Sequence, residues 1–159
     1  LRPANFPTIR LAQIAALYAT NDHLFSKIIA ANTKEELYGL FDVKASGYWD
    51  THYNFGVVSA RSSKRLTRKF IDLLAINTLI PIKFCYASQQ NSDVLEQLLA
   101  LARTISAEKN TIITHFNTLR PTATNAMESQ GLLQLKNNYC DANYCLRCAV
   151  GNSILNTEG

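Results

Sequence analysis

The chain has 159 residues, of which 47% are hydrophobic and 18% are charged, a balance that suits a globular protein and excludes a disordered one. A chain of this length can bury its own core, so we expect a single helical domain over residues 1–159. No apolar run reaches the length needed to cross a bilayer, because Pro81 and polar neighbours interrupt the best candidate, residues 71–86. We therefore expect no membrane contact.

The net charge of +4 is uneven along the chain. Residues 1–79 carry ten Lys/Arg and six Asp/Glu, whereas residues 80–159 carry six of each. Five of the ten cations in the first half fall between Arg61 and Lys69. The excess charge thus belongs to one part of the chain, and it favours an anionic partner there.

Apolar residues recur with helical spacing over most of the first sixty positions. The stripe of Leu11, Ile14, Ala15 and Tyr18 predicts a helix over residues 8–20. A second helix is expected from Leu24, and a capping box at residues 33–36 starts a third. Residues 42–60 lose the pattern and are rich in aromatic side chains, which predicts an ordered loop with a short extended piece near residues 55–59.

The second half of the chain shows the same periodicity. Further helices are expected over residues 64–78, 93–104 and 126–136, with Asn125 as the cap of the helix at 126–136. A short helix is expected at residues 112–116 and a last one from Tyr144 to Leu155. Pro81 should kink or split the helix that precedes it. The prediction is an all-α fold, an irregular bundle of about seven or eight helices with one long aromatic-rich loop and no sheet of three or more strands.

The cations of the first half form the first candidate site. Ser62 or Ser63 is expected to cap a helix whose apolar face includes Leu66 and Phe70. The cations would lie opposite that face, beside free backbone N–H groups that attract phosphate. The candidate polyanion-binding residues are Arg61, Lys64, Arg65, Arg68 and Lys69. The alternative is a solvated helix face with no ligand.

The second candidate site is a possible metal centre near the end of the chain. Cys140, Cys145 and Cys148 have the spacing C-x4-C-x2-C, and clustered thiolates can hold zinc or an iron–sulfur cluster. Such sites usually need a fourth ligand, for which the candidates are Cys85, His52, His115, Asp141 or a group outside the given sequence. The alternative is three packed, reduced thiols. The four cysteines are too few for a disulfide scaffold. This indicates a reducing, cytoplasmic location.

The aromatic-rich loop offers a third possibility. Asp50 and His52 are close in sequence and can serve acid–base chemistry, with Arg10 as a further member of such a site. The alternative is structural: Trp49 and the tyrosines fix the loop to the helices, and Asp50 caps a turn.

Several segments resemble a known family. They are RPANFPTIR at 2–10, YWDTHY at 48–53, IDLLAINT at 71–78, SQGLLQLKNNYC at 129–140 and CLRCAVG at 145–151. In this order they resemble the C-terminal part of a bacterial family with a domain of unknown function. The resemblance implies no activity and no catalytic residues. It implies that roughly the first half of the parent protein lies upstream, and this missing N-terminal region is then a partner of the chain.

Three functions are compatible with the sequence. The first is a binding or accessory domain of a larger bacterial protein, which contacts nucleic acid or another polyanion. The second is part of an enzyme whose catalytic site the missing N-terminal region completes. The third is a structural self-association domain. The oligomeric state does not follow from the residues.

Overall fold

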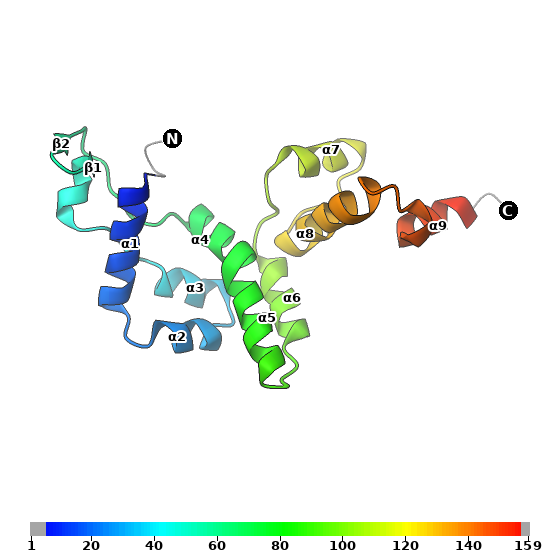
Figure 1. The fold of residues 1–159 in the computed structure, drawn as a ribbon, viewed down its shortest axis with the longest axis horizontal. Helices are drawn as coiled ribbons and strands as arrows, with labels where there is room; N and C mark the ends of the chain where they lie inside the picture. The colour runs from blue at the N-terminus through cyan, green and yellow to red at the C-terminus, as the bar shows by residue number, and fades with distance from the viewer. Residues whose placement is uncertain (1–5, 157–159) are drawn as a thin grey trace. The chain divides into compact units, whose positions relative to one another are not determined.

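The structure is a computed structural model that describes residues 6–156. Over this range most residues are helical, and the one sheet has two strands (Figure 1). The predicted all-α class is therefore confirmed. The chain divides into two compact units, Leu1–Leu98 and Leu99–Gly159, and each is described by itself. The single domain expected from the chain length stays a prediction.

The first helix, α1, spans Pro7–Thr20 and confirms the helix predicted from the apolar stripe. Proline fits its first position because the N–H that proline lacks would have no helical partner there. The buried face carries Ile9, Gln13 and Leu17, four residues apart. The predicted stripe is a different one, and its members Leu11, Ile14 and Tyr18 are exposed.

Two short helices follow, α2 at Leu24–Ala30 and α3 at Lys34–Leu40. The capping box predicted for the start of α3 is present. The backbone N–H of Glu36 donates to Thr33 Oγ1 at 3.2 Å, and Glu36 Oε2 accepts from the backbone N–H of Thr33 at 2.9 Å. These reciprocal bonds satisfy N–H groups that have no partner within the helix.

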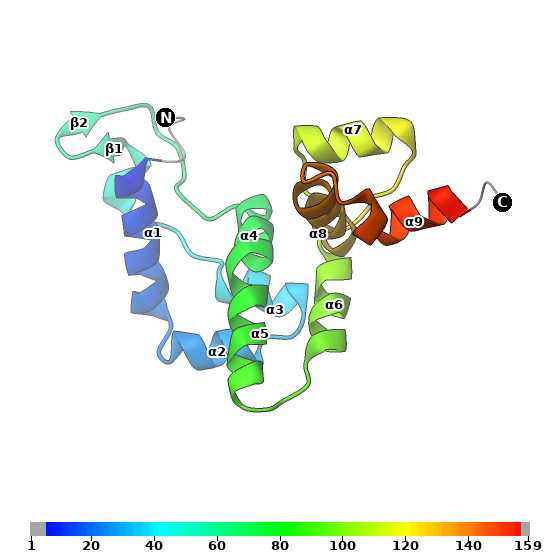
Figure 2. The same cartoon turned by 45° about the vertical axis from the view of Figure 1, so that its right-hand side comes forward.

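The aromatic-rich loop is ordered, as predicted. It contains a 3₁₀ turn, η2 (Gly47–Asp50), and a hairpin of β1 (His52–Asn54) and β2 (Val57–Val58). The hairpin lies at the N-terminal end of α1 in both views of the ribbon (Figures 1 and 2). Trp49 packs in a small core with Ile9 and Ala45, which fixes the loop to α1.

The chain then runs extended before α4, which covers Arg68–Leu74. The prediction of helix from residue 64 is wrong for residues 64–67. Their backbone bonds go to a distant segment instead: Lys64 O accepts from the N–H of Ala45 at 3.2 Å, and Leu66 N–H donates to Val43 O at 3.0 Å. Thr67 Oγ1 then accepts from the N–H of Phe70 at 3.3 Å and caps α4.

A π-helical turn, η3 (Ala75–Leu79), joins α4 to α5 (Ile80–Gln89). The backbone N–H of Ile80 donates to Ala75 O, five residues back, so the turn holds one residue more than an α-helical turn. Pro81 therefore does not split the helix, which runs without a break over Arg68–Gln89. The nine labelled α-segments make eight helices in the described range when α4 and α5 count as one.

This continuous helix bears on membrane contact. It has 22 residues and a mean hydropathy of 1.5 over its best window, enough by length and composition to cross a membrane. The prediction that no apolar run reaches this length is therefore wrong. The observation is weak evidence for a membrane, because core helices of soluble proteins pass the same test, and Lys83 of this helix is buried among protein oxygen atoms.

The described part of the second unit consists of helices joined by short non-helical segments. The helix α6 (Leu95–Thr104) leads into it and is followed by α7 (Thr111–Leu119) and α8 (Ala126–Leu135), which ends in a second π turn, η4 (Lys136–Cys140). All three helices were predicted from the sequence, as was the cap of α8, where Asn125 Oδ1 accepts from the N–H of Glu128 at 3.1 Å. Ser129 is fully buried against this unit's core.

The last described elements are a 3₁₀ turn, η5 (Cys145–Arg147), and α9 (Ala149–Asn156). The predicted helix start at Tyr144 is therefore wrong, and Asn152 N–H makes the first α-helical bond, to Cys148 O at 2.9 Å. Gly151 lies against the preceding turn. A Cβ at this position would be 2.3 Å from Cys145 O, so only glycine allows this close approach.

Candidate functional site

Four of the five cations proposed to bind a polyanion are exposed, namely Arg61, Arg65, Arg68 and Lys69. Arg65 forms an ion pair with Asp42 in which both side chains are more than half exposed, and such surface pairs contribute little to stability. The chain is not helical before Arg68, and Arg65 lies in an isolated bridge with Lys44, so the cations are spread along the chain. The prediction that a helix capped at Ser62 or Ser63 carries these cations opposite its apolar face is wrong for Lys64 and Arg65, because α4 begins at Arg68.

Lys64 is the exception, and its assignment to the binding surface is wrong because its side chain is buried. Its Nζ donates to Ser62 O at 2.9 Å and lies 4.0 Å from the centre of the Tyr53 ring. Hydrogen bonds from Lys64 and Ser62 hold the pKa of Tyr53 below its ordinary value. Gln13 Nε2 also donates to Lys64 O at 3.1 Å. Lys64 therefore links α1 and the hairpin to the basic segment.

The ring of Tyr38 brings two cations to one surface. The Arg68 guanidinium lies 5.3 Å from the ring centre, and Lys34 Nζ lies 5.4 Å from it, within the range of a cation–π contact. Tyr38 OH donates to Asp72 Oδ1 at 2.7 Å, and burial together with this bond raises the pKa of Tyr38 to about 12. Lys34 was missed from the sequence, although its place four residues before Tyr38 on α3 was a signal.

The residues considered for acid–base chemistry have different neighbours. Asp50 Oδ2 accepts from Lys44 Nζ at 2.7 Å, and this bond holds the pKa of Asp50 below its ordinary value. The His52 ring instead stacks on Tyr48, with 4.0 Å between ring centres. His52 Nδ1 lies 2.9 Å from Tyr48 O. The imidazole is thus oriented by Tyr48 and not by the carboxylate.

Arg10 is placed apart from that pair. Its guanidinium stacks 3.6 Å from the centre of the Phe70 ring, and its Nη1 donates to Gln13 Oε1 at 2.8 Å. Partial burial lowers the pKa of Arg10. The arrangement favours the structural interpretation of the loop, in which Trp49 is buried and fixes it to α1.

The cysteine segment contains a Schellman motif, in which a left-handed residue ends a helix. Asn143 has φ 56°, its N–H donates to Cys140 O at 3.1 Å, and the N–H of Tyr144 donates to Tyr139 O at 2.9 Å. Cys140 therefore lies before the helix end and Cys145 after it. The expectation that Cys145 and Cys148 share the first turn of a helix is wrong, because α9 begins at Ala149.

The cysteines also differ in exposure. Cys140 and Cys145 are exposed and Cys148 is buried, so the interpretation as three packed thiols applies to Cys148 alone. Within residues 6–156 no group of three His, Cys, Asp or Glu side chains is placed to hold a metal ion. The zinc or iron–sulfur site stays a prediction that this geometry does not support.

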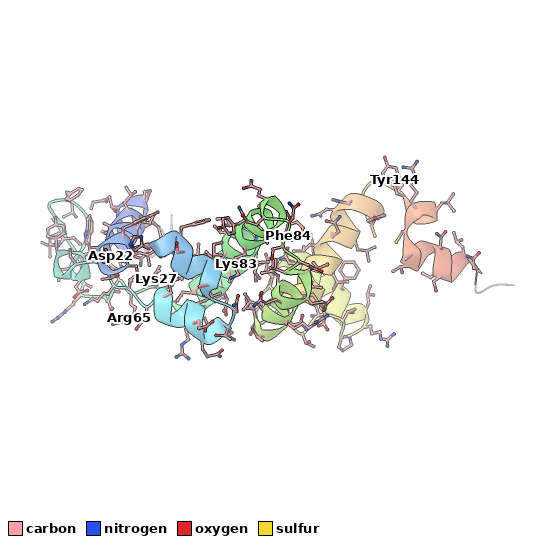
Figure 3. The ribbon with its side chains drawn as sticks, turned by 90° about the horizontal axis from the view of Figure 1, so that it is seen from below. Asp22, Lys27, Arg65, Lys83, Phe84 and Tyr144 are labelled. Carbon is pink, nitrogen blue, oxygen red and sulfur yellow. The ribbon has the colours of Figure 1, made fainter. Side chains whose placement is uncertain are left out.

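Lys83 of α5 is the most constrained charged side chain that the sequence analysis missed. It is only 5% exposed, whereas its neighbour Phe84 is 48% exposed (Figure 3). Lys83 Nζ donates to oxygens at the end of α2: Ile29 O at 2.5 Å, Ala31 O at 2.6 Å, Ile28 O at 3.2 Å and Asn32 Oδ1 at 3.2 Å. The available signal was a single cation within an apolar run.

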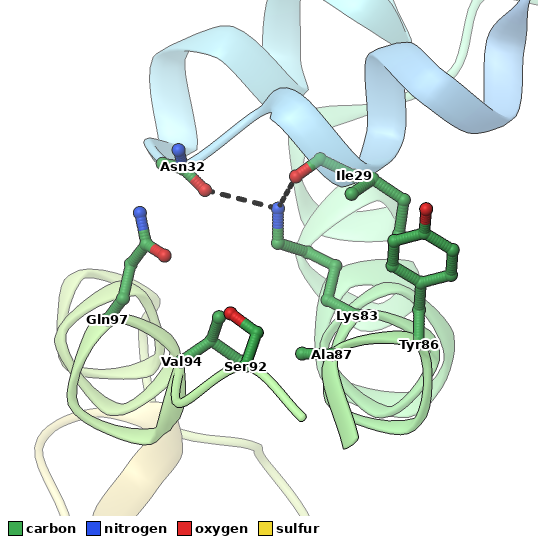
Figure 4. Close-up of a pocket in the computed structure, with 8 residues that line it drawn as sticks. All are labelled: Ile29, Asn32, Lys83, Tyr86, Ala87, Ser92, Val94 and Gln97. Atoms are coloured by element: carbon green, nitrogen blue, oxygen red, sulfur yellow. Dashed lines mark hydrogen bonds between the residues drawn. The ribbon is translucent and has the colours of Figure 1, made fainter. Parts of the chain in front are cut away.

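A small pocket of about 120 Å³ lies beside Lys83. Its lining includes Asn32, Tyr86, Ser92 and Gln97 (Figure 4). Burial holds the pKa of Lys83 below its ordinary value, and the charge of Glu36 opposes this shift only in part. Because protein oxygens accept all the protons of the ammonium group, Lys83 is not placed to act on a ligand. It holds the C-terminal end of α2, where carbonyl groups favour a cation.

An apolar groove of about 250 Å³ lies between α1 and α4. Ile14 and Leu17 line it from α1, and Phe70 and Leu74 line it from α4. Arg10 is the charged residue among those that line it. Of the hollows described here, this one is the most apolar, and it adjoins the exposed stripe of α1.

The fold and these sites define an all-α protein with an exposed basic segment and an apolar groove. A family model matches residues 1–111, and the chain therefore belongs to the family described as protein of unknown function (DUF2851). The match covers the basic segment, the groove and Lys83, and it ends before the cysteine segment. Neither the curated proteins nor the solved structures give a match.

Proposed function

We propose that this chain is a binding domain that contacts nucleic acid through Arg61, Arg65, Arg68 and Lys69. The observation that carries the proposal is the exposure of these four cations within nine residues. Phosphate contacts of this kind supply most of the sequence-independent affinity for nucleic acid. Lys34, which shares the ring of Tyr38 with Arg68, adds a fifth cation to the same surface.

The spacing of these cations suits a polymer. Residues 61–67 are not helical, and residues 64–66 pair with residues 43–45, so Arg61 and Arg65 are spread along the chain and not gathered on one helical turn. Arg68 and Lys69 then stand in the first turn of α4, where free backbone N–H groups add to the positive potential. Cations along a line match successive phosphates of a strand better than they match one isolated anion.

The wider setting is also part of the proposal. The resemblance to a bacterial family suggests that the chain is an accessory domain in the C-terminal part of a larger protein. Its sparse cysteines fit a reducing, cytoplasmic location. We therefore expect the nucleic-acid contact to support an activity that lies elsewhere in the full protein, because Asp50, His52 and Arg10 have separate partners here.

The test uses the full chain and fluorescein-labelled single- and double-stranded DNA, with anisotropy measured over a range of salt concentrations. The double variant Arg68→Glu, Lys69→Glu should weaken binding roughly tenfold or more and reduce the salt slope by about two. The fold should persist, because acidic residues in a first helical turn are favourable.

The matched control is Lys109→Glu, Arg120→Glu, which makes the same change in net charge at two exposed cations of the second unit. If both double variants lose affinity equally, the binding follows net charge and the assigned surface is refuted. Absence of any salt-dependent binding by the unaltered chain refutes the proposal as a whole.

A further inference from the structure

The helix α1 has two apolar faces, and only one of them is buried. Ile9 and Leu17 face the core of the first unit. The other face carries Leu11, Ile14 and Tyr18, which are 65%, 50% and 67% exposed. Spacings of three and four residues place these three side chains in one stripe along the helix. An apolar stripe on a helix is normally buried against another part of the protein or against a partner.

The stripe continues into the apolar groove between α1 and α4. Ile14 belongs to both, and Phe70 and Leu74 line the groove on the α4 side. Leu73, next to Leu74, is 44% exposed and extends the apolar surface along α4. A contiguous exposed apolar surface that contains a groove is typical of a protein-docking site.

The charges beside the groove and along α4 next to it are cationic. Arg10 lines the groove, Arg65 precedes the groove residue Leu66, and Lys69 stands one turn before Leu73 on α4. The helix α1 contains neither Asp nor Glu. Among the acids of the first unit, Asp42 pairs with Arg65, and Asp72 accepts from Tyr38 of α3. The exposed Asp22 follows α1, at the end of the stripe opposite to Arg10.

We propose that the surface formed by Leu11, Ile14, Tyr18, Leu73 and the groove binds an acidic amphipathic helix of a partner protein. Apolar side chains at helical spacing would enter the groove and cover the stripe, as in other helix-in-groove complexes. Carboxylates on the flank of that helix would face Arg10 and Lys69. The charge match selects this occupant over a basic or purely apolar one. The proposal shares Lys69 with the nucleic-acid contact, whereas its apolar surface on α1 is separate from that contact.

The experiment titrates the full chain with two synthetic amphipathic peptides about 18 residues long, which is enough for helix in isolation. Both peptides have leucines on one face, and they differ only in having Glu or Lys on the flanks. Isothermal titration calorimetry at low salt should show tighter binding of the Glu peptide. Equal or tighter binding of the Lys peptide would overturn the charge argument, and lack of binding by both peptides would overturn the docking site.

Variants then locate the binding. Ile14→Gln, Tyr18→Gln should weaken binding of the Glu peptide roughly tenfold or more, whereas Leu119→Gln, Leu146→Gln, at exposed leucines of the second unit, should not. Circular dichroism checks that each variant is folded. Unchanged affinity of the first variant contradicts the proposal. So does a dimer that the first variant dissociates in sedimentation, because a second copy would then be the occupant.

Discussion

The ammonium group of Lys83 donates a hydrogen bond of 2.6 Å to the carbonyl oxygen of Ala31, which lies 52 residues earlier in the chain. This bond ties α5 to the residue that ends α2. Three further oxygens of residues 28–32 accept from the same group. One side chain thus satisfies the carbonyl groups that a helix end leaves without partners.

Replacement of Lys83 by methionine should lower the free energy of unfolding by about 2–4 kcal/mol, because the change leaves several buried acceptors without a donor. Urea denaturation at neutral pH measures the effect. Lys69→Met is the matched control, since Lys69 is exposed on the same continuous helix, and its cost should stay within about 0.5 kcal/mol. If both variants lower the free energy of unfolding by similar amounts, water molecules replace the ammonium group as hydrogen-bond donors to these oxygens.

Acidification should remove the stability that Glu36 supplies. Hydrogen bonds from the N–H groups of Asn32 and Thr33 hold the pKa of Glu36 below its ordinary value of 4.5. A carboxylate with a lowered pKa in the folded state contributes stability above pH 4.5 that is lost as the pH falls through the folded pKa.

Glu36→Gln should therefore be less stable than the unaltered chain at neutral pH, with the difference shrinking as the pH falls below 4.5. Chemical denaturation at a series of pH values gives both curves. The control is Glu35→Gln, in the same turn of α3. Its free energy of unfolding should still fall with the pH as it does in the unaltered chain. A Glu36→Gln curve parallel to that of the unaltered chain would contradict the capping-box explanation.

Two glycines make a matched pair. Gly151→Ala should destabilise the end of the second unit by about 1–3 kcal/mol, because its Cβ would lie 2.3 Å from Cys145 O. Gly131→Ala should instead stabilise α8 by about 0.5–1 kcal/mol, since a Cβ at this helical position meets nothing within 4 Å. Thermal unfolding and limited proteolysis compare the two. Equal and small effects would show that η5 and α9 do not pack as described.

The cysteines should differ in reactivity. Under native conditions iodoacetamide should modify Cys85, Cys140 and Cys145, which are exposed, and leave the buried Cys148 unmodified until the chain unfolds. Mass spectrometry locates the modified residues. Cys145→Ser should change stability by less than about 0.5 kcal/mol, and Cys148→Ser should cost more because its side chain is buried. Joint protection of Cys140, Cys145 and Cys148, with stoichiometric zinc or iron in protein purified without chelator, would instead support the predicted metal site.

Local signals in the sequence predicted local structure well. Thr33 with Glu36, and Asn125 before α8, predicted helix starts that depend on residues three positions apart. The stripe of Leu11, Ile14 and Tyr18 predicted α1 as a helix, but the face that is buried is the one with Ile9, Gln13 and Leu17. Periodicity shows which side chains share a face and not which face meets the core, and Gln13 is buried through a bond to Lys64, 51 residues away.

Long-range pairing explains the other differences. Residues 64–66 have the composition of a helix start, yet their backbone bonds join residues 43–45, which no local pattern indicates. For the same reason Lys64 is buried beside Tyr53, whereas Arg61 and Arg65 remain exposed. Lys83 could not be assigned from the sequence, because its four acceptors lie more than fifty residues upstream.

The π turn at Ala75–Leu79 sets the angular phase of α5 relative to α4. One extra residue rotates every later side chain by about 100° around the helix axis compared with an uninterrupted α-helix. A shortened chain that lacks one residue of this turn would keep a long apolar helix, but it would turn Lys83 away from the carbonyl groups of α2. The inserted residue therefore decides whether the cation of α5 points into the protein or toward solvent.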